Sequence, residues 1–406
     1  MEQRATSLTR EHPGARLYLA GSSECPRSWR GASGDHAASM CGVGGYVSED
    51  PDDFHVHELP KYRPEGSGEH TMALILKVGR TTDEALKALA IGSGVDPKSF
   101  GYAGRKDKHA VTTQWISAHL EPEQLISADE QVVVLERHAH RHKLKLGHLE
   151  GNLFSTRISG LERPEVFELG LARLRAGIPN YFERQRFGRA RYARRPEEGY
   201  LPPIDDAGRP LQDSSNLATD NVDTALRILN APRRRRLKGY EKLSLSALQS
   251  ALFNLWLGAR VQDGLMSQVI LGDVCRKVEG GTFYSTEPEV DTDRLARGEI
   301  EVLGPLVGPK LFPARDEALA REEALYARWG LDASLRESLG REWRGSRRAA
   351  LLKPRALSGT LERSVTSGVC ARLSFILPSG SFATALLGDL IDPHSEGFKR
   401  GPHPSS

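Results

Sequence analysis

The chain has 406 residues, 39% of them hydrophobic, which is enough for two domains that each bury a core. Its 56 Lys and Arg residues nearly balance 53 Asp and Glu, so the net charge of +3 points to no class of partner by itself. The four cysteines form no Cys-x-x-Cys pair, which argues against a zinc ribbon and a disulfide framework; they are Cys25, Cys41, Cys275 and Cys370. The sequence also shows no export signal and no apolar run long enough to cross a membrane. These features predict a cytoplasmic protein.

The N-terminal half is predicted to begin with a poorly ordered extension, residues 1–40, which is rich in Gly, Ser and Arg and lacks periodicity. Residues 72–78 have the composition of a buried strand, and residues 82–90 that of a helix with Thr or Asp near its cap. A β-branched and aromatic run at 111–117 predicts a strand that leaves a tight turn. Asp107 should therefore lie on a loop held by a sheet.

The segment 137–146 ends in strict alternation of basic and apolar residues. This pattern predicts a strand that turns Lys143 and Lys145 toward phosphate and packs Leu144 and Leu146 on its other face. The histidines around it are better explained as solvated side chains than as a metal site, because no carboxylate or cysteine accompanies them at a useful spacing; they are His138, His140, His142 and His148.

A second domain is predicted from Gly177 onward, where long helical patterns begin. Its clearest helix is 245–261, whose apolar residues recur at three- and four-residue spacing and are explained by ordinary core packing. The C-terminus is predicted to form a strand at 371–377, a turn at 378–384 and a helix at 385–391. This returning unit should complete the first domain.

Basic residues are clustered rather than spread evenly, which suits the neutralisation of a polyanion such as RNA. Taken singly, each cluster is better explained as a solvated face. The clusters are Arg105 to Lys108, Arg137 to Lys145, residues 184–195 and residues 233–236.

Asp107 is the leading candidate for chemistry. Arg105, Lys106 and Lys108 surround it, and opposite charges favour an ionised carboxylate, which can act as a nucleophile or general base. Gly101 and Gly104 would permit close approach by a ligand. A plain charged turn explains this stretch equally well on local grounds. The chain lacks the serine-hydrolase elbow, the phosphate-binding loop and the His-Glu-x-x-His motif.

Ordered blocks along the chain resemble the TruD family of tRNA pseudouridine synthases, from near Val47 almost to the end. The blocks are residues 50–56, 68–70, 102–112, 151–154, 179–182, 185–188, 250–254 and 377–384. The resemblance implies that uridine-13 of transfer RNA is isomerised to pseudouridine by a monomer, with no cofactor and no metal. It also implies an α/β (α+β) fold, in which a mixed, largely antiparallel catalytic sheet is interrupted by an α/β insertion domain, with RNA in the cleft between them.

Residue by residue, the resemblance implies that Asp107 is the nucleophile and that Phe54, Asn152 and Phe382 contact the substrate. A flipped uridine needs aromatic faces and an amide at its edge. Phe154 can supply a further aromatic face. Arg105 or Lys106 is expected to neutralise phosphate or Asp107.

The domain boundaries follow from the blocks and the composition shift: residues 41–176 and 353–406 for the catalytic domain, residues 177–352 for the insertion. Two departures from the family's pattern stand out. Residues 48–50 are Ser-Glu-Asp where a basic residue is usual, and Glu183 replaces a glycine.

Two other functions stay open from the residues alone. One is a catalytically silent RNA-binding protein that uses the same basic surface. The other is a carboxylate-nucleophile N-glycoside hydrolase, in which Asp107 would need a second acid such as Glu150 or Asp273.

Overall fold

The computed structural model describes residues 42–182, 221–230, 237, 239–328, 331, 333, 336, 343–364, 368–392 and 400–401. The predicted N-terminal extension, the basic runs at 184–195 and 233–236, the block at 185–188 and Glu183 lie outside these residues.

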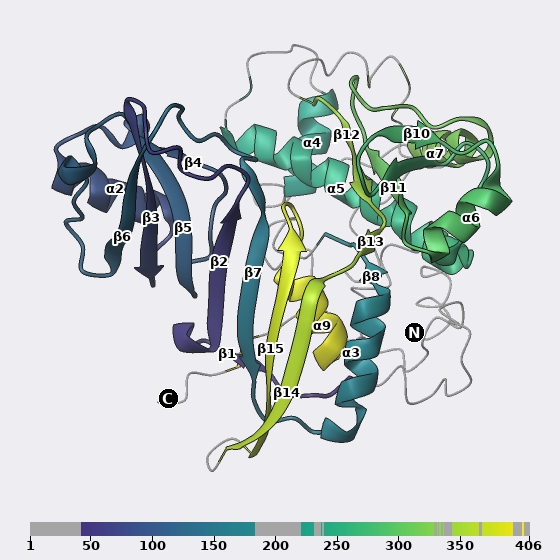
Figure 1. Ribbon diagram of the computed structural model, residues 1–406. Coiled ribbons are helices and arrows are strands. Elements are labelled where there is room, and N and C mark those ends of the chain that lie inside the picture. The colour runs from purple at the N-terminus through teal and green to yellow at the C-terminus, as the bar shows by residue number, and fades with distance from the viewer. Residues whose placement is uncertain are drawn as a thin grey trace.

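An eight-stranded sheet forms the larger part of the described fold (Figure 1), in the order β14-β15-β7-β2-β5-β3-β6 with β4 paired to β5. Every neighbouring pair is antiparallel except β2 and β5, which confirms the predicted mixed, largely antiparallel sheet. The strands are β2 Phe54–Pro60, β3 His70–Val78, β4 Gly101–Tyr102, β5 Val111–Ala118, β6 Val132–His140, β7 Leu149–Ile158, β14 Arg355–Ser364 and β15 Gly368–Pro378. The strands predicted at 72–78, 111–117 and 371–377 are confirmed.

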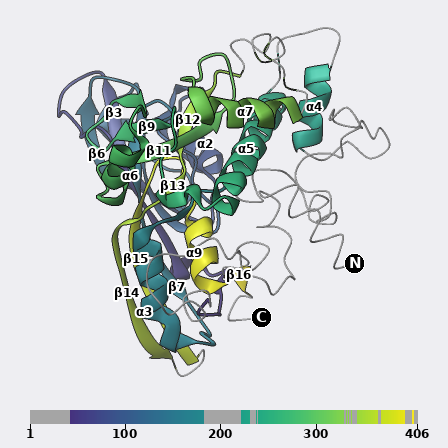
Figure 2. The same cartoon turned by 90° about the vertical axis from the view of Figure 1, so that its right-hand side faces the viewer.

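Three helices cover one face of this sheet: α2 Thr82–Ser93, α3 Phe167–Ala176 and α9 Ala383–Ile391. Alternation along the strands explains why, because Ala73, Ile75 and Ile116 pack against α2 while Phe154 and Phe375 pack in the cluster that contains α3 and α9. Figure 2 shows α3 and α9 beside β14 and β15. The C-terminal strand and helix thus complete this part of the fold, as predicted.

The helix α2 begins and ends where its sequence specifies. Thr81 is the N-cap and forms a capping box with Glu84, and Gly94 ends the helix in a left-handed conformation with φ of 68°. The helix predicted at 82–90, with a threonine at its cap, is confirmed.

A second body lies above α3 and α9 (Figure 2) and is built around the long helix α5 Gly239–Gln262. Its sheet has the order β10-β9-β11-β12. The helix predicted at 245–261 is confirmed, and its apolar residues form the core of this body. The other elements are β9 Val274–Lys277, β10 Thr282–Tyr284, β11 Ile300–Leu306, β12 Ser346–Ala349, α4 Asn221–Asn230, α6 Pro288–Ala296 and α7 Asp316–Arg328.

Short elements complete the described chain. The strands β8 Ile178–Pro179 and β13 Leu351–Leu352 pair where the chain passes between the two bodies, and β1 Val47–Ser48 pairs with β16 Arg400–Gly401. The 3-10 helices are η3 Pro51–Asp53, η4 Pro97–Ser99, η5 Pro122–Gln124, η6 Pro164–Val166 and η10 Leu265–Ser267. No described helix has the length and apolar character required to cross a membrane.

The alternating strand predicted over 137–146 is wrong beyond His140. Strand β6 ends there because its neighbour β3 begins opposite, at His70. The main chain then leaves the sheet, and the Leu144 N–H donates to the Ser117 hydroxyl at 2.7 Å. Leu144 is buried, but Leu146 is 70% exposed, so the two leucines do not share a packed face.

Candidate active site

Asp107 lies on the loop 103–110 between β4 and β5, as predicted, and its side chain is exposed. One carboxylate oxygen accepts a hydrogen bond from the main-chain N–H of His109 at 3.0 Å. The main-chain carbonyl of Asp107 accepts a hydrogen bond from the Lys77 ammonium at 2.6 Å. The carboxylate is therefore presented to solvent while its backbone is held from below.

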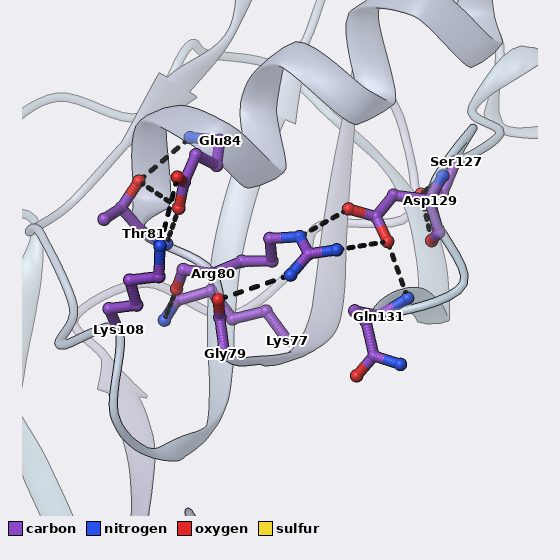
Figure 3. Close-up of polar contacts among 9 residues, drawn as sticks. All are labelled: Lys77, Gly79, Arg80, Thr81, Glu84, Lys108, Ser127, Asp129 and Gln131. Carbon is purple, nitrogen blue, oxygen red and sulfur yellow. Dashed lines mark hydrogen bonds and ion pairs between the residues drawn. The ribbon is translucent and has the colours of Figure 1, made fainter.

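Three buried side chains fix this loop to the sheet and to α2. Lys77 donates to the carbonyl of Asp107 and to the carbonyl of Arg80, and Figure 3 shows the second of these bonds. Burial lowers the pKa of Lys77 to about 8. The Gln114 amide donates to the carbonyl of Gly104 at 2.6 Å and accepts from the Thr82 hydroxyl at 3.1 Å. The same hydroxyl accepts from the Lys106 N–H at 2.9 Å. Such anchoring limits where Asp107 can move.

The N-terminus of α2 lies next to the loop and is itself braced (Figure 3). Glu84 closes the capping box with Thr81 and also contacts the Lys108 ammonium at 3.4 Å. Arg80, just before the helix, forms an ion pair with Asp129 at 2.6 Å. These contacts join the loop, the helix end and the segment before β6.

Lys106 bridges two neighbouring strands. Its ammonium lies 2.6 Å from Glu58 Oε2 on β2 and donates to Asn152 Oδ1 on β7 at 2.5 Å. The side chains of Lys106 and Glu58 are 4% and 0% exposed. Burial raises the pKa of Glu58, and Lys106 opposes that shift. With its ammonium enclosed in this way, Lys106 is not placed to meet a phosphate, which leaves Arg105 as the candidate for that role.

Phe54 and Phe154 lie on the same sheet face as Glu58 and Asn152, since Phe54 pairs with Thr156 and Glu58 with Asn152 in register. Their ring centroids are 6.0 Å apart, and Phe154 stacks on Phe375 at 5.3 Å. Both rings are almost fully buried. The described geometry thus shows them as part of the sheet core beside the site, and a contact with a base remains a prediction.

Phe382 belongs to a different cluster. Its ring contacts Phe182 at a centroid distance of 6.1 Å, on the core of the second body. Arg348 stacks over Phe182 at 4.0 Å and donates to the carbonyl of Gly380 at 2.7 Å. The turn that carries Phe382 follows Leu377, which is paired with Asn152 in the sheet. Phe382 therefore packs on the second body, at the end of a strand of the large sheet, and its contact with a substrate remains a prediction.

Arg105 is more exposed than Lys108, the other exposed cation of the loop. Its side chain is 71% exposed and lies 3.4 Å from Asp83, a contact too exposed to hold it firmly. Unlike Lys106, it is accessible to a phosphate group.

The residues 48–50, which depart from the family's pattern, stabilise the turn before Phe54. Ser48 donates to Asp53 at 2.5 Å, and the Asp50 carboxylate accepts from the Asp52 N–H at 3.0 Å.

The two candidate second acids have other partners. Glu150 pairs with Arg355 at 2.7 Å in an exposed contact. Asp273 is buried against Arg260 at 2.7 Å in the second body. Within the described residues, no group of three or more His, Cys, Asp and Glu side chains is arranged to hold a metal ion.

Sequence reasoning missed Lys77, Glu58, Thr82 and Gln114. A signal was present for two of them, since Glu58 and Lys77 are charged residues that continue the inward-facing alternation of Phe54 and Val56 and of Ala73 and Ile75. Buried charges of this kind need partners and often mark functional sites.

Comparison with solved structures supports the fold. The chain is similar to the crystal structure of a putative tRNA pseudouridine synthase D from Methanosarcina mazei, with a TM-score of 0.62 and 21% identity, covering 87% of this chain and 94% of that one. The architecture is therefore that of the TruD-type enzymes.

Sequence comparison adds the family. The sequence model of the family tRNA pseudouridine synthase D (TruD) matches residues 34–195 and 219–390. A tRNA pseudouridine synthase D from an Anaeromyxobacter species is 40% identical over 362 residues, covering 88% of this chain and 96% of the relative. One from Thermus thermophilus is 35% identical over 357 residues, covering 86% and 89%. The chain belongs to the TruD family.

Proposed function

We propose that this protein is a tRNA pseudouridine synthase that isomerises uridine-13 of transfer RNA, with Asp107 as the nucleophile. The bond between ribose carbon 1′ and base nitrogen 1 breaks, and a bond from carbon 1′ to base carbon 5 forms. The hydrogen on carbon 5 is lost, and nitrogen 1 gains one. Atoms are conserved, so no co-substrate or cofactor is required. The relatives' names support the reaction class.

The observation that carries this proposal is the anchoring of Asp107. Its backbone is held by buried Lys77 and by a loop tied to Thr82 and Gln114, while the carboxylate is exposed. A nucleophile held in this way loses little conformational freedom when it attacks. The covalent addition is compatible with attack on the base or on the ribose.

The two alternatives have less support. A hydrolase needs a second carboxyl group near Asp107, but Glu150 and Asp273 are paired with arginines, and Glu58 is paired with Lys106. A silent RNA-binding protein would have no need for several buried anchors beneath one loop.

We also propose that transfer RNA lies between the two bodies, with residues 41–176 and 353–406 as the catalytic domain and residues 177–352 as the insertion. The described cores support this division, because one cluster contains residues between Tyr181 and Ala350 and another contains residues on either side of that interval. Phe382, which bridges the two, would then contact the substrate at their junction.

The experiment is to incubate the purified chain with unmodified transfer RNA, map pseudouridine by position and measure free uracil. The proposal expects pseudouridine at position 13 and no release of uracil. Release of uracil would favour the hydrolase, and binding without conversion would favour the silent protein.

A further inference from the structure

The amide of Asn152 is in contact with a buried ion pair. Lys106 reaches from the Asp107 loop to Asn152 Oδ1 at 2.5 Å and to Glu58 Oε2 at 2.6 Å. Glu58 and Asn152 are direct neighbours across β2 and β7. Strands β2 and β7 and the Asp107 loop therefore meet at the ammonium group of Lys106.

Chemistry fixes which way this amide points. An ammonium group has donors only, so the Asn152 atom that faces it must be the acceptor oxygen, and the flipped amide would bring two donors together. The Nδ2 group consequently points away from Lys106. It makes no hydrogen bond to any part of the chain that the structure describes. The two Nδ2 hydrogens of the amide thus have no acceptor among the residues that the structure describes.

Glu58 explains why Lys106 stays in place. An isolated buried ammonium would be costly, and the carboxylate neutralises it. Glu58 Oε1 also accepts from the Trp115 N–H at 3.4 Å, which ties the carboxylate to β5. The position of the ammonium, and with it the orientation of the amide, is thereby set by the sheet.

We propose that Glu58 and Lys106 are positioning residues that fix the Asn152 amide with its NH₂ group toward the substrate, so that the enzyme reads the target base by donating to one of its carbonyl oxygens. This rests on the proposed function. In this arrangement the amide oxygen faces Lys106, so the side of the amide that meets the base carries the donor group rather than the acceptor. A base edge that presents a donor at that point is rejected, since two donors would face each other.

The first test compares Asn152→Asp with Asn152→Ala in the full chain, using unmodified transfer RNA and single-turnover conversion. An aspartate keeps the shape and can pair with Lys106, but it has no donor. We expect both variants to fall about 100-fold below the wild type, as for the loss of one committed hydrogen bond. Conversion by Asn152→Asp within a few-fold of the wild type would overturn the inference, because an acceptor would then suffice.

The second test asks whether the ion pair acts through Asn152. Lys106→Met alone would leave Glu58 buried and unpaired, so the double variant Glu58→Gln/Lys106→Met is used, with circular dichroism to check its fold. In this background Asn152→Ala should cost less than about 10-fold, because the amide is no longer oriented. A full 100-fold cost would show independent roles and overturn the inference.

A separate control distinguishes this inference from the proposed function. If the wild type converts uridine and Asp107→Asn does not, the proposed function holds, and the Asn152 variants then test the amide alone. If Asp107→Asn converts uridine normally, the proposed nucleophile fails whatever the Asn152 variants show.

Discussion

The ammonium group of Lys77 lies 2.6 Å from the main-chain carbonyl oxygen of Asp107, and the Lys77 side chain is completely buried. A second bond, to the carbonyl of Arg80 at 2.7 Å, fixes its other side. The candidate nucleophile is thus held through its backbone, by a residue on β3 that is distant in sequence. This arrangement anchors Asp107 through its main chain, while its side chain is exposed.

The lowered pKa of Lys77 should be detectable in the pH dependence of the free energy of unfolding. Burial lowers its pKa to about 8, while Asp107 opposes the shift. Between about pH 8 and the ordinary lysine value of 10.5, the unfolded chain binds more protons than the folded one, so the free energy of unfolding rises with pH in that window. The contribution is at most about 1.4 kcal/mol per pH unit. Below pH 8 both states are protonated and the contribution is flat.

Urea unfolding of the wild type and Lys77→Met at pH 7, 8, 9 and 10 measures this difference. The wild type should gain stability relative to the variant only above pH 8. Parallel curves across the whole range would contradict the assignment.

The Gln114 amide should matter for turnover more than for binding. Gln114→Leu removes the donor to the Gly104 carbonyl and the acceptor of the Thr82 hydroxyl, which costs about 1–3 kcal/mol and loosens the loop. We expect kcat to fall about tenfold or more while KM for transfer RNA changes little. Thr113→Val, on the opposite face of β5, is the matched control. Equal effects of the two changes would argue against a role for the loop anchor.

Arg105 should contribute to RNA binding rather than to chemistry. Arg105→Ala removes an exposed cation next to Asp107, so affinity for transfer RNA should fall and the salt dependence of binding should lose about one unit of slope. Arg297→Ala, an exposed arginine paired with Glu299 after α6, serves as the control. Filter binding at several salt concentrations measures both. An unchanged slope in Arg105→Ala would remove Arg105 from the interface.

Arg348 should position the turn that carries Phe382. Arg348→Met removes the bonds to Gly380 and Asn180 and should lower the free energy of unfolding by about 1–3 kcal/mol, together with a loss of kcat/KM. Arg355→Met removes only an exposed pair with Glu150 and should change stability by less than about 1 kcal/mol. If Arg348→Met were as mild as Arg355→Met, the turn would be held by other contacts.

Much of the fold could be predicted from local patterns. The capping box and the terminal glycine of helix α2 can be recognised within one short stretch of sequence, and β5 has a run of β-branched and aromatic residues. The alternation at 143–146 was misleading because a strand also needs a neighbour, and β3 offers none beyond His70. Local pattern alone does not contain that information.

The site was only partly predictable for the same reason. Asp107 stood out by its charged surroundings and by family resemblance, but its anchors come from β3, α2 and β5 and meet only in the folded chain. Lys106 illustrates the limit: in sequence it resembles Arg105, yet it is buried against Glu58 and Asn152 while Arg105 is exposed. The direction in which each side chain leaves the folded loop, not composition, separates the two.

The measurement that tests the central claim most directly is single-turnover mapping of pseudouridine in transfer RNA with Asp107→Asn. Asp83→Asn, a nearby exposed aspartate at the start of α2, is the matched control. We predict that Asp107→Asn still binds transfer RNA but forms no pseudouridine at position 13, while Asp83→Asn converts it near the wild-type rate. Conversion by Asp107→Asn at a comparable rate would contradict the claim that Asp107 is the nucleophile.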